Sequence, residues 1–207
     1  MAKGSESKKR IGVMGGTFDP VHLGHTGVAE AALIEAELDE VIFMPAYIQP
    51  FKQDRYVADG SDRFKMLELA TIHDDRLKVS SWELEQETVS YTYDTICHLI
   101  EEENYKDIFF LMGSDSMMQL ERWMHGEDLL KICNFVVGLR PTNVRKQVKE
   151  EAKRLSDTYG TKIVLLEKTM LPISSTIIRE KVSEGQPIAG LVSPLVEEYI
   201  YANELYI

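Results

Sequence analysis

Short apolar segments alternate with helix-forming segments along most of the chain. Strands are predicted where β-branched, aromatic and other apolar residues cluster, at residues 11–14, 41–44, 77–80, 108–112, 134–138 and 162–166. Helices are predicted between them, at residues 23–37, 62–72, 91–103 and 144–158. Strands alternating with helices indicate a parallel sheet, because parallel strands need long crossover connections. We therefore expect an α/β fold with a doubly wound parallel sheet and ligands bound beyond the carboxyl ends of its strands.

The first predicted strand ends in a glycine pair and a turn, which lead into a helix. Residues 15–25 read GGTFDPVHLGH. Gly15 and Gly16 let the backbone approach a ligand closely, as residues with a side chain could not. Asp19 and Pro20 favour a turn, and the Ala-, Leu- and Glu-rich stretch after them favours a helix. The free N–H groups at the start of that helix favour a bound phosphate.

Two histidines, His22 and His25, lie three residues apart and so share one face of this helix start. Three interpretations are open from the residues alone. The pair is structural, or it belongs to a zinc site, although the remaining His and Cys residues show no metal-ligand spacing. In the third interpretation, both imidazoles donate hydrogen bonds to phosphate oxygens in a phosphoryl or nucleotidyl transfer.

A second helix start lies far along the chain, where residues 173–179 read ISSTIIR. Ser174 or Ser175 is the expected N-cap. Taken alone, this is an ordinary capped helix. Its hydroxyls, its free N–H groups and Arg179 would also bind a polyphosphate. Two helix starts suited to phosphate make a nucleotide site the favoured interpretation.

Together these stretches resemble the two hallmarks of the HxGH nucleotidyltransferases, a T-F-D-P-x-H-x-G-H turn and an I-S-S-T-x-x-R helix. The best match within that superfamily is the bacterial nicotinate mononucleotide adenylyltransferases. The chain shares with them, at similar spacing, SYTYDT at residues 90–95, GSD at 113–115, LERW at 120–123 and FVVGLRP at 135–141. The likeness runs from about Lys9 to the last residue and implies the Rossmann-like fold of that superfamily.

The resemblance implies that AMP is transferred from ATP to nicotinate mononucleotide, giving nicotinate adenine dinucleotide and pyrophosphate in NAD biosynthesis. His22, His25 and Arg179 are then the catalytic residues. Mg²⁺ is the expected cofactor, bound mainly through the ATP phosphates; its protein ligands are unknown. The implied ATP site comprises Gly15, Gly16, Thr17, Phe18, His22, His25, Gly113, Asp115, Ile173, Ser174, Ser175, Thr176 and Arg179. The implied pyridine mononucleotide site comprises Thr17, Lys52, Thr92, Trp123 and Arg140.

One loop departs from the family pattern. The family usually carries a Pro-Pro-His-Lys run after the second strand, whereas residues 49–52 read QPFK here, with Phe51 in place of the histidine. Ala46 and Tyr47 also stand where the family tends to have polar amides. The change bears on acceptor preference more than on reaction type, so nicotinamide mononucleotide and phosphopantetheine remain alternative acceptors. A non-catalytic nucleotide-binding protein is disfavoured, since His22, His25, Lys52 and Arg179 are all present.

The length of 207 residues and a hydrophobic content of 44% allow one sizeable core. Residues 1–9 are predicted to form a flexible N-terminal arm and residues 10–171 a nucleotide-binding α/β domain. Two further helices, at residues 175–184 and 194–201, are expected to form a small C-terminal helical subdomain, residues 172–207, that completes the ATP site.

A net charge of -11 without an extended basic cluster argues against nucleic acid as a partner. The expected partners are the small-molecule substrates ATP and nicotinate mononucleotide, and a homo-oligomer is left open. Two widely separated cysteines favour a reducing compartment. With neither a long apolar span nor the apolar segment of a signal peptide in the sequence, we expect a cytoplasmic protein without a membrane partner.

Overall fold

The computed structural model describes residues 9–48, 57–139, 145–167 and 171–207. The strands in these ranges are β1 (Arg10–Gly16), β2 (Glu40–Pro45), β3 (Leu77–Val79), β4 (Asp107–Gly113), β5 (Asn134–Gly138) and β6 (Ile163–Leu165). The longer helices are α1 (Leu23–Glu35), α2 (Gly60–Thr71), α4 (Thr92–Glu101), α7 (Arg145–Tyr159), α8 (Ser175–Ser183) and α9 (Pro194–Ala202). The shorter ones are α3 (Trp82–Glu85), α5 (Ser114–Met117), the 3₁₀ turn η1 (Leu120–Arg122) and α6 (Gly126–Ile132).

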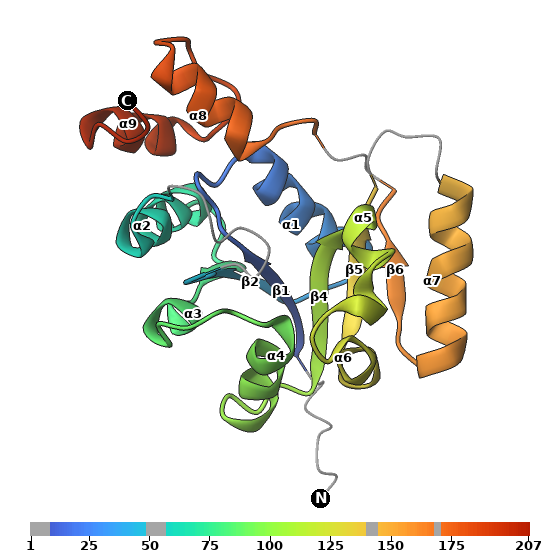
Figure 1. Cartoon of the computed structure of the whole chain (residues 1–207). Helices are drawn as coiled ribbons and strands as arrows, with labels where there is room; N and C mark the ends of the chain where they lie inside the picture. Colours follow the sequence, from blue (N-terminus) through green and yellow to red (C-terminus); the bar gives the residue numbers. More distant parts are fainter. Residues whose placement is uncertain (1–8, 49–56, 140–144, 168–170) are drawn as a thin grey trace, which may run out of the picture.

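The strands form one parallel sheet in the order β3-β2-β1-β4-β5-β6. β1 pairs with β2 on one side and with β4 on the other, so Val13 lies opposite both Ile42 and Phe110. β1 and β4 are the two central strands, and from them the chain winds outward in both directions. This confirms the predicted doubly wound α/β fold (Figure 1). The reversal of strand order between β1 and β4 is where such sheets bind ligands.

The sheet separates two apolar clusters, because successive side chains of a strand point to opposite faces. Met14 of β1 and Phe43 of β2 face the cluster that also contains buried residues of α1, α2, α8 and α9. Val13 and Ile42 face the other cluster, which is covered by α4, α6 and α7. Fully buried strand residues on both faces fit a parallel sheet covered on both sides.

The C-terminal helices pack onto the first of these clusters. Ile178 and Val182 of α8 and Val196 and Ile200 of α9 are buried in the same cluster as residues of α1 and α2. Figure 1 shows α8 and α9 beside α1 and α2 at one end of the molecule. The domain boundary at residue 172 stays a prediction, but the helices after it share their apolar core with the sheet.

All six predicted strands and the six predicted helices are present, and each of their ends lies within two residues of the predicted one. The four short elements α3, α5, η1 and α6 were not predicted. Within the described ranges, no helix is long and apolar enough to span a membrane.

Candidate functional site

The candidate site begins at the carboxyl end of β1, beside β4. Gly15 and Gly16 are the last residues of β1, and Gly16 lies opposite Pro45 of β2. Gly113 ends β4 and leads directly into α5, with Asp115 in the first turn of that helix. The glycine turn after β1 and the turn with Gly113 and Asp115, both predicted to bind ATP, therefore follow neighbouring strands at the reversal of strand order.

The histidine pair forms the first turn of α1. His22 is the N-cap residue, and the backbone N–H of His22 donates a hydrogen bond to Nδ1 of His25 at 3.3 Å. The two rings are stacked, with centroids 3.7 Å apart. This confirms that the histidines lie close enough to contact one ligand. Because Nδ1 of His25 accepts a hydrogen bond, a neutral His25 carries its proton on Nε2, where it can be donated to a ligand.

Burial keeps His22 uncharged near neutral pH. Its residue surface is 8% exposed, and burial lowers its pKa to about 4 against the opposing effect of a backbone hydrogen bond. Nδ1 of His22 is buried and has no hydrogen-bond partner among the described residues. A neutral imidazole has one N–H group, which can donate a hydrogen bond to a phosphate oxygen. In the described part of the chain, no ion pair of His22 has to be broken first.

Phe18 supports the pair from the side. It has a left-handed backbone conformation, with φ of 51°, and its ring is buried. The ring packs edge-on against His25, with centroids 5.0 Å apart, and against Phe43 at 5.7 Å. A Cβ on Gly16 would lie 3.1 Å from Cζ of Phe18, so glycine at this position leaves room for the ring. The apolar wall of the site is thus built by residues of its own motif.

The start of α8 lies against the turn before the histidines. Ser174 caps α8 by accepting a hydrogen bond from the backbone N–H of Ile177 at 3.3 Å. Ser175 Oγ donates to the backbone oxygen of Pro20 at 2.9 Å. Arg179 Nη1 donates to the backbone oxygen of Asp19 at 2.6 Å. The two motif stretches, more than 150 residues apart in sequence, therefore meet at this turn.

The remaining predicted residues lie around this centre or beyond the described residues. Ile173 packs on the apolar cluster of α1, and Thr176 is exposed in the first turn of α8. Thr92 begins α4, and Trp123 follows η1 with its ring edge-on to Phe110. Among the described residues, no hydrogen bond or ring contact joins Thr92 or Trp123 to the histidine pair. Lys52, Arg140 and the departing loop residues 49–51 lie outside the described residues.

Two residues at the site were not predicted from the sequence. Arg63 of α2 is 3% exposed, and its guanidinium donates to the backbone oxygens of Ala58, Thr17 and Ala46 at 2.8–2.9 Å. Burial lowers its pKa, although Asp19 opposes this effect. Arg63 thereby ties the loop after β1 to the loop after β2. Tyr206, after α9, donates its hydroxyl to Asp19 Oδ1 at 2.8 Å. A lone arginine or tyrosine has no spacing pattern that would mark it.

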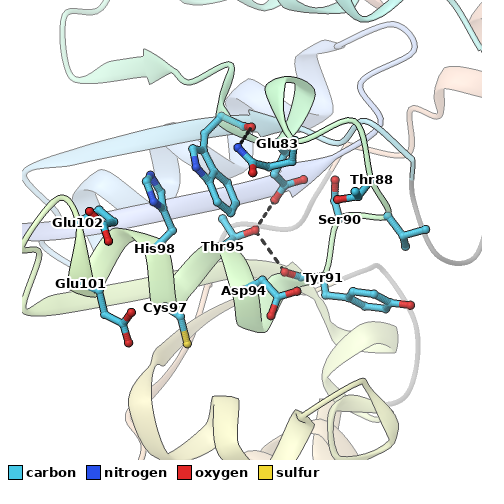
Figure 2. Close-up of a pocket in the computed structure, with 13 residues that line it drawn as sticks. Glu83, Thr88, Ser90, Tyr91, Asp94, Thr95, Cys97, His98, Glu101 and Glu102 are labelled. Atoms are coloured by element: carbon cyan, nitrogen blue, oxygen red, sulfur yellow. Dashed lines mark hydrogen bonds between the residues drawn. The ribbon is translucent and has the colours of Figure 1, made fainter.

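A separate pocket of about 420 Å³ lies between α3 and α4 (Figure 2). On one side Trp82 stacks on His98, with ring centroids 4.2 Å apart. The buried carboxylate of Glu83 accepts a hydrogen bond from Thr95 Oγ1 at 2.6 Å. Burial raises the pKa of Glu83, and hydrogen bonds from Thr95 and Ser90 oppose the rise. The pocket lining includes Tyr91, the residue before Thr92, but none of the residues predicted for substrate binding.

The sequence of the chain is similar to a family model and to the sequences of known proteins. Residues 13–181 match the model of the cytidylyltransferase-like family. A probable nicotinate-nucleotide adenylyltransferase of Thermoanaerobacter sp. is 41% identical over 202 residues, which cover 97% of this chain and 96% of the relative. Another, from Moorella thermoacetica, is 38% identical over 198 residues, covering 95% of this chain and 91% of the relative.

Solved structures show the same fold at lower identity. The Plasmodium falciparum nicotinic acid mononucleotide adenylyltransferase complexed with NaAD superposes with a TM-score of 0.75 at 21% identity. The superposition covers 96% of this chain and 97% of that one. The sheet order and the flanking helices are therefore those of a known architecture.

Proposed function

The chain belongs to the cytidylyltransferase-like family, and from its likeness to nicotinate-nucleotide adenylyltransferases we propose that it transfers AMP from ATP to nicotinate mononucleotide. The products are nicotinate adenine dinucleotide and pyrophosphate. The protein is a nucleotidyltransferase of NAD biosynthesis, and its partners are small nucleotides. We place the reaction in the cytoplasm because both cysteines, Cys97 and Cys133, are free.

The observation that carries this proposal is the meeting of two helix starts at one turn. The first turn of α1 holds the stacked histidines, and the first turns of α8 hold Ser175 and Arg179. Ser175 and Arg179 contact the turn at Pro20 and Asp19, two and three residues before His22. Such a place offers N–H groups, two imidazoles, a hydroxyl and a guanidinium to one polyphosphate.

In the proposed reaction, a phosphate oxygen of the mononucleotide attacks the α-phosphorus of ATP in line, and the bond to pyrophosphate breaks. No covalent intermediate on the protein is needed, because the nucleophile is already an anion. The residues of the chain position the two phosphates and stabilise the charge of the transition state. His25 donates from Nε2, and His22 donates as a neutral imidazole.

Arg179 is suited to the outer phosphates. A guanidinium has five N–H donors, and among the described residues only its Nη1 has a partner, Asp19. Nε and Nη2 remain for phosphate oxygens. Arg179 therefore binds phosphate while Nη1 keeps it anchored on the turn.

Mg²⁺ is proposed to arrive with ATP. Among the described residues, no group of three or more His, Cys, Asp or Glu side chains could hold a metal ion. We propose that phosphate oxygens and water hold most of the coordination sphere of the ion, as they often do for Mg²⁺ in nucleotide sites. When bound, it shares the charge of the leaving pyrophosphate.

The other substrate contacts follow from the family resemblance and stay proposals. Gly113 and Asp115 hold the adenosine, with the carboxylate near the ribose or the base. Thr92 and Trp123 hold the pyridine mononucleotide, the indole stacking on its ring. Lys52 and Arg140, which lie outside the described residues, are proposed to bind the same substrate.

The test is product formation from ATP and Mg²⁺ with nicotinate mononucleotide, nicotinamide mononucleotide or phosphopantetheine, each adenylylated product being identified by mass. Strong preference for nicotinate mononucleotide is the expected result. Activity with another acceptor alone would keep the mechanism and replace the substrate. ATP binding without product from any acceptor would refute the proposal in favour of a nucleotide-binding protein.

A further inference from the structure

The carboxylate of Asp19 is buried at the centre of the site and is held from three directions. Asp19 is 3% exposed. Its Oδ1 accepts hydrogen bonds from the Tyr206 hydroxyl at 2.8 Å and from the backbone N–H of Ala58 at 3.1 Å. Its Oδ2 lies 3.4 Å from Nη1 of Arg179. Each oxygen of the carboxylate thus has its own set of partners.

This division of partners fixes the direction in which Oδ2 points. Two donors on Oδ1 set the rotation of the carboxyl group about its bond to Cβ. Oδ2 then lies beside the same guanidinium nitrogen that donates to the Asp19 backbone oxygen at 2.6 Å. Arg179 therefore makes a hydrogen bond to the backbone and an ion pair with the carboxylate of the same residue, and these two contacts restrict the direction of its remaining N–H groups. Charge-assisted bonds of this kind are stronger and more directional than neutral ones.

Tyr206 is placed to remain a donor at all working pH values. Its ring packs at the edge of the apolar cluster of α1, α8 and α9. Burial and the Asp19 carboxylate raise the pKa of its hydroxyl well above the usual value, against smaller opposing effects of Arg179 and Arg63. The hydroxyl thus keeps its proton, and its bond to Asp19 persists.

We propose that Tyr206 is a positioning residue that acts on ATP through Asp19 and Arg179, an inference that rests on the proposed role of Arg179 as a phosphate ligand. Its hydroxyl holds the Asp19 carboxylate in the rotation that orients the guanidinium toward the triphosphate. Without that hydroxyl, Oδ1 keeps only the N–H of Ala58 as a donor. The carboxylate can then rotate, and it no longer holds the guanidinium of Arg179 in one orientation. ATP binding weakens, whereas binding of the mononucleotide does not change.

The test is Tyr206→Phe, which removes the hydroxyl and keeps the ring. We expect the KM for ATP to rise about tenfold, the usual effect of losing one hydrogen bond to a charged group. The KM for the mononucleotide should stay within a factor of two. The affinity of a non-hydrolysable ATP analogue, measured by calorimetry, should fall by the same factor as the KM for ATP rises.

Tyr199→Phe is the matched control. Tyr199 of α9 also donates its hydroxyl to a carboxylate, Asp62 Oδ1 at 2.8 Å, but this pair joins α9 to α2 and shares no hydrogen bond or ion pair with Asp19 or Arg179 among the described residues. Both variants lose one tyrosine–carboxylate bond of the C-terminal segment. If Tyr206 only stabilised the fold, the two variants would lower the unfolding temperature and change the ATP parameters alike. We expect the ATP effect in Tyr206→Phe alone.

A double-mutant cycle separates positioning from general damage. In an Arg179→Gln background, Tyr206→Phe should change ATP affinity less than twofold, because the route through the guanidinium is already lost. An undiminished tenfold effect in that background, or wild-type ATP affinity of Tyr206→Phe alone, would overturn the inference. A wild-type protein that binds the analogue but forms no product with any acceptor refutes the proposed function only, since the affinity readout needs no acceptor.

Discussion

The imidazole rings of His22 and His25 lie face to face, with centroids 3.7 Å apart and planes inclined by 19°. His22 is the N-cap residue of α1, and the ring of His25 accepts a hydrogen bond from its backbone N–H. The two side chains thus form one unit with the helix start. Each ring therefore packs directly against the other.

Replacing His25 removes the Nε2 donor that we propose for the reacting phosphates. His25→Ala should lower turnover by about 10²- to 10³-fold, the usual cost of deleting one transition-state donor. Steady-state assays with saturating ATP and mononucleotide measure this directly. His73→Ala, a change at an exposed histidine after α2, is the control and should leave turnover unchanged. Near-normal turnover of His25→Ala would remove His25 from the mechanism.

The buried His22 predicts a loss of stability in mild acid. Burial lowers its folded pKa to about 4 from 6.5, so the unfolded chain binds a proton below pH 6.5 while the folded protein does so only near pH 4. The contribution of His22 to the free energy of unfolding is constant above pH 6.5 and falls by about 3 kcal/mol as the pH drops to 4. Urea unfolding at pH 7.5 and 4.5 measures it. The pH difference should shrink in His22→Gln, and an equal difference in both proteins would contradict the assignment.

Arg63 should be a stability determinant. Arg63→Lys leaves the backbone oxygens of Thr17, Ala46 and Ala58 with fewer donors in a buried place, because an ammonium cannot reproduce the planar fork. We expect the free energy of unfolding to fall by about 3 kcal/mol. Chemical denaturation gives the value. Arg76→Lys, at an exposed ion pair with Asp74, is the control and should leave the free energy of unfolding nearly unchanged.

Gly113 allows stability and nucleotide binding to be separated. A Cβ at this position would meet no described atom within 4 Å, and the backbone angles, φ of -80° and ψ of 157°, suit any residue. Gly113→Ala should therefore keep or slightly raise the unfolding temperature. If adenosine approaches the backbone there, ATP affinity falls about tenfold or more. Unchanged affinity would move the adenosine away from this turn.

The parts of the fold that repeat a local pattern were predictable. The strands and the longer helices follow from runs of apolar residues, and the histidine spacing placed His22 and His25 together on one helix turn. The short helices α3, α5 and α6 have too few residues for a periodic signal. They are held by tertiary packing, as the complete burial of Leu129 in α6 illustrates.

The contacts that assemble the site were beyond prediction for a different reason. Asp19 was identified from the sequence as a turn residue, and nothing near it indicated that its carboxylate is buried. Its partners Arg179 and Tyr206 lie 160 and 187 residues further along the chain. Such a pairing follows from the folded arrangement of α1, α8 and α9 rather than from any spacing of residues. The hallmark motifs indicated the candidate site without revealing the contacts that hold its residues together.

The hydrogen bond between Tyr206 and Asp19 joins two residues that are synthesised at different times. On the ribosome, Asp19 emerges 187 residues before Tyr206, so the turn and both histidines leave the exit tunnel long before their last support exists. A nascent chain can pair β1 with β2 and β4 while Asp19 still lacks Arg179 and the tyrosine hydroxyl. The strands of the sheet can therefore pair before Arg179 and Tyr206 are available to support the turn that carries the histidines.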